Sequence, residues 1–362
     1  MKVLVASILL SAVILNSCIE SNSTTVTKTI DAPSIISGEA QGTTYTISYY
    51  GSREISKSGV DSLLNTIDLS MSNWVSQSMI SRFNAGKDSV VIDQHFLRNL
   101  TASYIFNRET QGAFNPLVKP LVDYYGFGIE SKKIESIDSN KIESLLLDTS
   151  LDSIKILYGN RVMGIMDIML SSTIQDSMVL LNNNECQLDF NAIAQGYSAD
   201  ATAMYLMQQG AESYLIEIGG EMVTRGVKKN GAKWKVGIDR PEENASQRVL
   251  EAAIEVEDKG IATSGNYRKF YESNGTKYHH TIDPITGYPA KHNLLSATVI
   301  ASTSAAADAL ATSFMVMGLE KSVAYLESKK NGVQAFLIYS NANGEYEYYI
   351  SEKLKPTLEI KN

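Results

Sequence analysis

The first residues that could do chemistry lie in an alanine-rich segment, AAADALATSF. Asp308 and Thr312 are four residues apart, so in a helix the carboxylate and the hydroxyl project from the same face. Hard oxygen donors of this kind suit Mg²⁺, which takes few protein ligands and keeps several waters. The same spacing also fits an aspartate near a helix N-terminus, favoured by the dipole, and a threonine packed in the core. The pair alone therefore leaves a metal site and a structural role open.

Two of the chain's four histidines stand side by side in YHHTIDPITGYPA, residues 278–290. On a strand, His279 and His280 point to opposite faces, so only one of them can enter a given site. An Asp-Pro turn follows, and Gly287 permits the positive φ that such a turn can need. An imidazole beside a metal-bound phosphate can act as general base toward a hydroxyl. The alternative is a strand histidine with satisfied hydrogen bonds.

Other segments offer polar and aromatic side chains to a ligand. In DFNAIAQGYSAD, Asp189 is expected to end a strand and Gly196 to open a helix, and the loop between them exposes backbone groups that can meet a phosphate or a metal. The Gln41 carboxamide lies in a second polar segment, QGTTY. Aromatic rings can stack on a planar ligand, although they are more often ordinary core. The aromatic candidates are Trp74, Phe114, Tyr125 and Phe127.

The elements that must position these residues follow from hydrophobic spacing. Helical periodicity predicts helices over 59–71, 93–111, 196–209 and 303–318. Alternation or short apolar runs predict strands within 38–51, 213–218, 233–241, 248–265, 294–302, 333–340 and 345–351. Segment 112–128 is rich in glycine, proline and aromatic residues, so we expect it to be irregular. No regular βαβ rhythm is present. The pattern therefore predicts an α+β fold with largely antiparallel sheets and packed helices in one catalytic domain.

The N-terminus predicts export. One lysine precedes an apolar run from Val3 to Leu15, and the ending LNSC resembles a bacterial lipobox whose cysteine, Cys18, carries lipid. An ordinary signal peptide with a chance cysteine is the alternative. We expect a lipoprotein signal peptide at 1–17, the lipidated Cys18 with a flexible tether at 18–37, and the catalytic domain at 38–356. The protein would then be a membrane-anchored lipoprotein on the periplasmic side of the inner membrane. A net charge of −8 and the lack of a Lys/Arg block argue against a nucleic-acid partner.

Taken in order, four segments resemble the ApbE family of FAD:protein FMN transferases, over about residues 38–320. They are GAFNPLVKPLVDYYGFG, LDFNAIAQGYSADATAMYLMQQGAESYLIEIGGE, ATSGNYRKFY with YHHTIDPITGYP, and SATVIASTSAAADALAT. The resemblance implies an enzyme that splits the diphosphate of FAD, passes FMN to a Ser or Thr hydroxyl of an acceptor protein and releases AMP. It also implies acceptors that are subunits of Rnf or sodium-pumping quinone reductase complexes and carry a short Ser/Thr flavinylation motif.

The resemblance also implies roles for individual residues. His280, three residues before the aspartate of the DPxTG motif, corresponds to the catalytic base. Mg²⁺ would be held by Asp308, Thr312 and the backbone carbonyl of Ala192. The FAD contacts carried over by motif position are Gln41, Trp74, Ala113, Phe114, Asn115, Asp189, Gln195 and Ile282.

The chain departs from the family pattern at several of these positions. Where many relatives have methionine, aspartate, glycine and lysine, this chain has Gln41, Asn115, Asn191 and Gln195. Replacement of lysine by glutamine removes a positive charge near a diphosphate. Two other functions remain as alternatives: an FAD pyrophosphatase that gives water the acceptor role, and a non-catalytic FAD-binding lipoprotein. A further, non-enzymatic alternative is an exported structural or adhesion domain.

Overall fold

The computed structural model describes residues 32–129, 134–146, 150–171, 178–181, 186–242, 249–266, 270–273, 276–328 and 332–361. Cys18 and the predicted signal peptide lie outside these residues. The first strand, β1 (Ser34–Ala40), starts before residue 38, because it pairs along its whole length with β2 (Thr43–Gly51) and buries Ile36. The last strand, β17 (Leu358–Ile360), pairs with β10 (Leu250–Val256) beyond residue 356. The folded region therefore extends past both ends of the expected 38–356 domain.

An eight-stranded sheet forms the centre of the described domain, in the order β1-β2-β7-β8-β11-β14-β15-β16. Every neighbouring pair in it is antiparallel. Its further strands are β7 (Ala211–Ile218), β8 (Glu221–Arg225), β11 (Gly260–Gly265), β14 (Leu294–Ala301), β15 (Gln334–Ser340) and β16 (Tyr346–Ile350). The predicted α+β fold with largely antiparallel sheets is confirmed.

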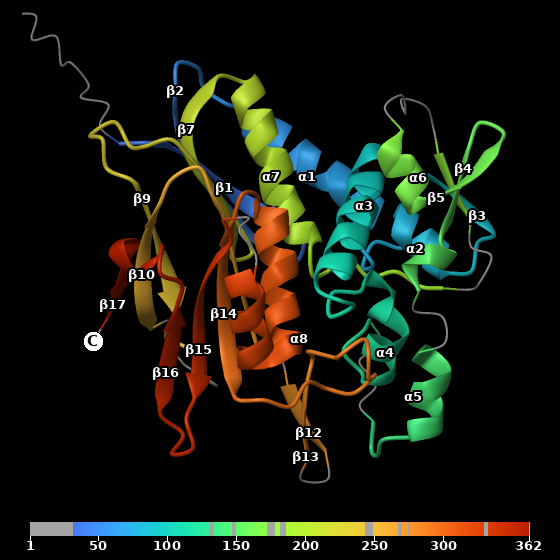
Figure 1. Cartoon of the computed structure of the whole chain (residues 1–362). Coiled ribbons are helices and arrows are strands. Elements are labelled where there is room, and N and C mark those ends of the chain that lie inside the picture. The colour runs from blue at the N-terminus through green and yellow to red at the C-terminus, as the bar shows by residue number, and fades with distance from the viewer. Residues whose placement is uncertain are drawn as a thin grey trace, which may run out of the picture. The chain divides into compact units, whose positions relative to one another are not determined.

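The two faces of this sheet carry different layers. Helices α7 (Ala194–Gln208) and α8 (Ser304–Ser328) cover one face (Figure 1). A three-stranded sheet of β17, β10 (Leu250–Val256) and β9 (Trp234–Asp239) covers the other, where its side chains share a core with Ile261 and Ile300. Successive strand residues point to opposite faces. Ala262 and Val299 accordingly pack with α8, whereas their neighbours Ile261 and Ile300 face the small sheet.

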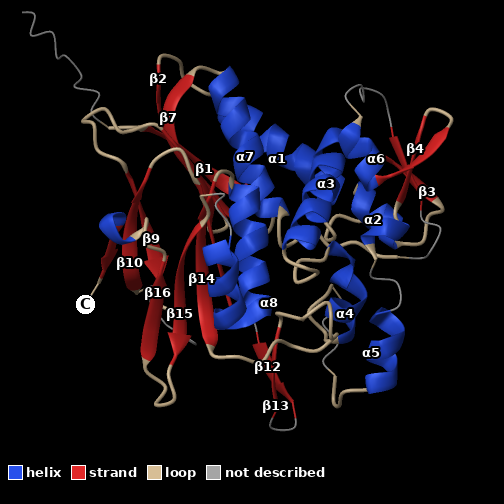
Figure 2. Ribbon diagram, viewed as in Figure 1, coloured by secondary structure: helices blue, strands red, loops and turns tan. Residues whose placement is uncertain are grey.

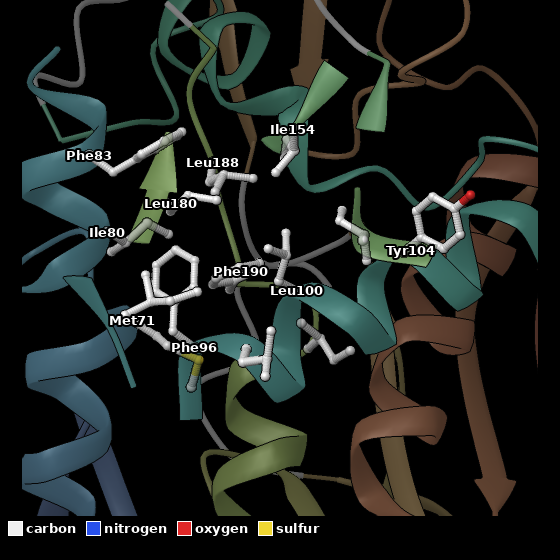
Figure 3. Close-up of a cluster of buried hydrophobic side chains, with 14 of the residues drawn as sticks. Met71, Ile80, Phe83, Phe96, Leu100, Tyr104, Ile154, Leu180, Leu188 and Phe190 are labelled. Atoms are coloured by element: carbon white, nitrogen blue, oxygen red, sulfur yellow. The ribbon is translucent and has the colours of Figure 1, made fainter. Parts of the chain in front are cut away.

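A second core lies between the helices that precede residue 110 and a four-stranded sheet (Figures 2 and 3). The helices are α1 (Lys57–Met71), α2 (Met79–Asn84) and α3 (Gln94–Glu109), and the sheet order is β3-β6-β4-β5. Phe96 of α3 meets Phe190 edge-to-face, with 5.2 Å between ring centroids. The strands and the adjoining helices are β3 (Ser89–Ile92), β4 (Lys155–Tyr158), β5 (Arg161–Gly164), β6 (Met178–Leu181), α6 (Ile165–Leu170) and the 3₁₀ turn Leu151–Ser153.

Two local expectations are wrong. Segment 112–128 is not irregular throughout, since it holds a 3₁₀ turn at Pro116–Val118 and helix α4 (Lys119–Tyr124). Residues 186–190 form no strand; side chains and loop carbonyls satisfy their backbone groups instead, as when Asn84 Oδ1 accepts from the Leu188 N–H at 2.7 Å.

The remaining elements are α5 (Ser139–Leu146), the hairpin β12 (Phe270–Ser273) and β13 (Thr276–His279), and a 3₁₀ turn at Lys355–Thr357. Helix α8 breaks at Gly318, whose φ of 76° is left-handed, and continues to Ser328. Across the described ranges, no helix combines the length and apolar character that a membrane span requires.

Candidate active site

Helices α7 and α8 cap one another. The N–H of Gly196, at the start of α7, donates to Asp308 Oδ2 of α8 at 3.1 Å. In return, Asp200 of α7 accepts from the amides of Ser304 and Ala305, at the start of α8, at 2.8 and 2.9 Å. A Cβ on Gly196 would lie 2.5 Å from the Ser304 carbonyl oxygen, so only glycine permits this approach. The reciprocal caps fix the first turns of α8 against the start of α7.

The predicted metal donors sit at this junction. Asp308 is buried, and burial raises the pKa of its carboxyl to about 7. The Thr312 hydroxyl, one turn further along α8, lies 3.2 Å from Ser264 Oγ on β11. Ala192 belongs to the turn that leads into α7 and packs in the same core cluster as Ala305 of α8. Two of the predicted donors, Asp308 and Thr312, thus lie on α8, and Ala192 lies in the turn before α7.

These residues fit a divalent cation. The groups that act on Asp308 are the Gly196 amide and the Asp200 carboxylate, and no cationic side chain in the described part of the chain forms an ion pair with it. A buried carboxylate without a counter-charge is costly, which is why its pKa is raised. One carboxylate, one hydroxyl and one carbonyl are hard oxygen donors of the kind Mg²⁺ accepts. The described residues contain no group of three or more His, Cys, Asp or Glu side chains suited to a metal.

The two histidines take different partners. His279 ends β13, and its Nδ1 lies 3.0 Å from the Asn266 carbonyl oxygen, with which it forms a hydrogen bond. His280 follows the strand and meets the ring of Phe127 edge-to-face, with 6.3 Å between centroids. The turn beyond it is closed by a hydrogen bond from the Gly287 N–H to the Asp283 carbonyl, 2.8 Å long, and Gly287 has a φ of 77°. The histidine turn therefore packs against the segment that follows α4.

The FAD-contact candidates of segment 112–128 are held by local contacts. Asn115 uses Oδ1 to accept from the Leu117 N–H at 3.0 Å, so its carboxamide caps the 3₁₀ turn. Ala113 and Phe114 are 3% and 2% exposed, and Phe114 packs on Phe106. Their side chains belong to the core, and any contact from them to a ligand runs through the main chain. Ile282 is likewise buried, within a cluster around α4.

Two glutamine candidates lie near the start of α7. Gln41 adopts a left-handed φ of 55° in the β1–β2 turn, and its Nε2 donates to Ser198 Oγ of α7 at 2.7 Å. Gln195 lies over the β7–β8 turn, since a Cβ on Gly219 would stand 2.7 Å from its Nε2. A hollow of about 530 Å³ opens beside Gln41. It is lined by Glu39, Ala40, Gly42, Thr43 and Thr44.

Trp74 stands apart from the other candidates. Its side chain is 64% exposed on the loop after α1, so it offers a free face for stacking. Asn73, beside it, points its Nδ2 toward the Leu188 carbonyl oxygen at 3.5 Å, and this joins the loop to the segment that carries Asp189. The Asp189 N–H in turn donates to the Pro116 carbonyl at 2.7 Å, and burial raises the pKa of the Asp189 carboxyl.

Contacts thus connect all the candidate segments to one another. The sequence alone indicates no role for Ser264, Asn266 or Ser198, because their partners lie far away in the chain. The contacts that connect the segments are Asn73 with Leu188, Asp189 with Pro116, Phe127 with His280, His279 with Asn266, Ser264 with Thr312, Gly196 with Asp308 and Gln41 with Ser198.

Comparison with known proteins identifies the family. The ApbE family model matches residues 41–337, and the chain belongs to the ApbE family. The FAD:protein FMN transferase of Vibrio cholerae is 33% identical over 330 residues, which cover 89% of this chain and 92% of that protein. The enzyme of the same name from Haemophilus influenzae is 30% identical, over 85% of this chain and 87% of its own length.

Solved structures agree as well. The flavin transferase ApbE from Vibrio cholerae superposes with a TM-score of 0.73 at 30% identity, over 90% of this chain and 98% of its own. The flavinyl transferase ApbE from Pseudomonas stutzeri gives a TM-score of 0.74 at 28% identity, over 90% and 96%.

Proposed function

We propose that this protein transfers FMN from FAD to a Ser or Thr hydroxyl of an acceptor protein, in a reaction that depends on Mg²⁺. That it is an FAD:protein FMN transferase follows from its family and from relatives of that name matched over most of their length. The observation that carries the magnesium requirement is the buried Asp308 carboxylate, with Thr312 one turn beyond it and Gly196 as its amide donor.

The reaction is a displacement at the phosphorus atom of the FMN half of FAD. The acceptor oxygen forms a bond to this phosphorus, and the phosphoanhydride bond breaks, so that AMP leaves with the bridging oxygen. The hydroxyl proton passes to the imidazole of His280, which acts as general base. Asp308, Thr312 and the Ala192 carbonyl would hold Mg²⁺, which neutralises the charge of the diphosphate and of the transition state.

The position of His280 supports its role as base. It follows the end of β13 and leads into the turn closed at Gly287, so its backbone is held from both sides. Its side chain is only partly buried. The base and the predicted metal donors thus come from different segments of the chain.

An acceptor assay tests this function. The purified protein is incubated with FAD, Mg²⁺ and an acceptor that carries a Ser/Thr flavinylation motif, and the intact mass of the acceptor, AMP and free FMN are measured. We expect the acceptor to gain the mass of one FMN with an equal amount of AMP. AMP with free FMN and an unmodified acceptor would instead identify an FAD pyrophosphatase, and FAD binding without AMP a non-catalytic flavin-binding protein.

The His280→Ala variant tests the base. Transfer should fall steeply, by about 10²- to 10⁴-fold, as general-base catalysis contributes. FAD binding, followed by flavin fluorescence, should persist. A variant that transfers FMN at the wild-type rate would refute the assignment of His280.

The membrane attachment is part of the same proposal. The lipobox-like ending before Cys18 supports a lipid anchor, an exported location at the periplasmic side of the inner membrane, and acceptors in Rnf- or sodium-pumping quinone reductase-type complexes. In cell fractionation, the wild type should be found with the membranes and Cys18→Ala in the soluble fraction. Equal distribution of the two proteins would argue against the anchor.

A further inference from the structure

The proposed reaction uses His280 and leaves its neighbour, His279, without a role. The Nδ1 atom of His279 lies 3.0 Å from the backbone carbonyl oxygen of Asn266. A carbonyl oxygen can only accept, so Nδ1 must carry the proton in this bond. The ring also lies 6.1 Å, centroid to centroid, from the ring of Phe270 on the paired strand β12. His279 is thus tied to one partner by a hydrogen bond and to a second by packing.

The carbonyl that accepts this bond belongs to a well-anchored part of the fold. Asn266 follows β11 directly, and its N–H and its Nδ2 donate to the carbonyls of Leu295 and Leu294 on β14, both at 3.3 Å. Two residues earlier, Ser264 on β11 meets the hydroxyl of Thr312. The end of β11 therefore touches the proposed metal helix through Ser264 and the histidine hairpin through Asn266.

Side-chain contacts hold the end of the hairpin: Tyr278 is buried beside Tyr125, and His280 meets Phe127 edge-to-face. Strands β12 and β13 form a two-stranded sheet separate from the eight-stranded one. An isolated pair of strands is at best marginally stable in water. The His279 bond ties the last residue of β13 to the residue that follows β11, a strand of the eight-stranded sheet.

We propose that His279 is a positioning residue. Its Nδ1–H, bonded to the Asn266 carbonyl, holds the end of β13 on β11 and so sets the place of His280 relative to Asp308 and Thr312. This inference rests on the proposed function in one respect, that His280 is the base. Misplacement of a catalytic group by about 1 Å can cost a factor of about 100 in rate.

Two substitutions separate the hydrogen bond from the packing. In His279→Asn, the carboxamide nitrogen can stand near the position of Nδ1 and keep the donor, while the ring is lost. In His279→Phe, a ring remains to pack against Phe270, but the donor is lost. We expect kcat of the Phe variant to fall by about 10- to 100-fold, and the Asn variant to keep most of the wild-type kcat. The KM for FAD and the melting temperature should change little in either.

A double-variant cycle tests whether His279 acts through His280. If it does, His279→Phe combined with His280→Ala should be no slower than His280→Ala alone, since a lost base cannot be misplaced. A further loss in the double variant would overturn the proposal, as would a fully active Phe variant. A parallel fall in activity and melting temperature in the Phe variant, with no recovery in the Asn variant, would also overturn it. That result would mean that His279 contributes only packing.

The same experiments keep the two proposals distinguishable. An inactive His280→Ala enzyme beside a fully active His279→Phe enzyme removes only the positioning role. An active His280→Ala enzyme removes the base assignment, and the positioning role falls with it.

Discussion

The amide of Gly196 donates its hydrogen bond to the carboxylate of Asp308 across the junction of α7 and α8, at 3.1 Å. The bond satisfies an N–H in the first turn of α7, where such groups lack partners within the helix. It also holds one oxygen of the carboxylate that we assign to Mg²⁺. Packing between the two helices is therefore coupled to the geometry of the proposed metal site.

Replacement of Gly196 by alanine should disturb both the packing of α7 on α8 and the geometry of the proposed metal site. The new Cβ would meet the Ser304 carbonyl oxygen at 2.5 Å and its carbon at 2.7 Å, and backbone atoms cannot rotate aside. We expect the free energy of unfolding to fall by about 1–3 kcal/mol, and the Mg²⁺ concentration for half-maximal transfer to rise. Chemical denaturation and a Mg²⁺ titration measure the two effects.

A matched control exists in Gly164, at the start of α6. Its φ of −82° suits any residue, and an added Cβ would approach only Asp167 Oδ2, at 3.6 Å. Gly164→Ala should stay within about 0.5 kcal/mol of the wild type. If the two variants had equal free energies of unfolding, α7 could move away from α8 at no cost. The close approach at Gly196 would then contribute nothing to stability.

The Thr312 hydroxyl gives a second prediction. Thr312→Val keeps the branched shape but removes the oxygen that faces Ser264, so the enzyme should need at least about tenfold more Mg²⁺ for half-maximal transfer. Thr312→Ser should restore much of the affinity. The control is Thr298→Val, which removes a hydroxyl bonded to Thr263 at 2.8 Å in the large sheet. A Thr312→Val enzyme with an unchanged Mg²⁺ requirement would exclude this hydroxyl as a donor.

The pH dependence of stability should depend on Asp200. Burial raises the pKa of its carboxyl to about 6, against an ordinary 3.8. Because the folded-state pKa is the higher one, the folded protein favours the protonated form. The associated stability is complete below about pH 4 and is lost as the pH rises through 6. Asn cannot titrate. Between pH 4 and 7, the free energy of unfolding of Asp200→Asn should therefore rise relative to that of the wild type, by up to about 3 kcal/mol.

Urea unfolding at pH 4.5 and 7.5 in the presence of EDTA tests this. The free energies of unfolding of the two proteins are compared at each pH. Because the Asp200 carboxylate raises the pKa of the nearby Asp308, its removal also lowers that pKa, and the difference between the two proteins reports on both carboxyls. A difference that stays constant with pH would contradict the raised pKa of Asp200.

Local patterns predict much of this fold. Helical spacing identifies α1, α3 and α7 to within a few residues, and the side-chain caps observed at Ser56 and Asp93 explain where α1 and α3 begin. Gly318 is a correctly predicted end of the first part of α8, because it takes the left-handed φ. Segment 186–190 does not form the expected strand, because an apolar run can pack as irregular chain when other side chains, such as Asn84, satisfy its backbone.

The candidate site is predictable from motifs as a set of residues, but not as an arrangement. The contact of Ser264 with Thr312 spans 48 positions, and that of Gly196 with Asp308 spans 112. No periodicity encodes contacts of that range, since they arise from the order of strands in the large sheet. The same limit applies to His279, whose neighbour in space is a loop carbonyl.

The final prediction concerns Gln195, where many relatives have lysine. Its side chain lies at the start of α7, over the β7–β8 turn. If this place faces the diphosphate of FAD, Gln195→Lys adds a positive charge beside a dianion. A partly exposed pair of this kind contributes up to about 1 kcal/mol, or roughly fivefold in Kd. The gain should shrink in high salt, because exposed charges are screened.

Flavin fluorescence titrations at low and high salt measure this effect. Gln208→Lys is the matched control, since it adds the same charge at the exposed far end of α7. Tighter binding in Gln195→Lys alone, greatest at low salt, would place a phosphate near the start of the helix. Equal tightening in both variants would reflect net charge only. Weaker binding in Gln195→Lys would mean that a glutamine contact, rather than a missing cation, holds the ligand there.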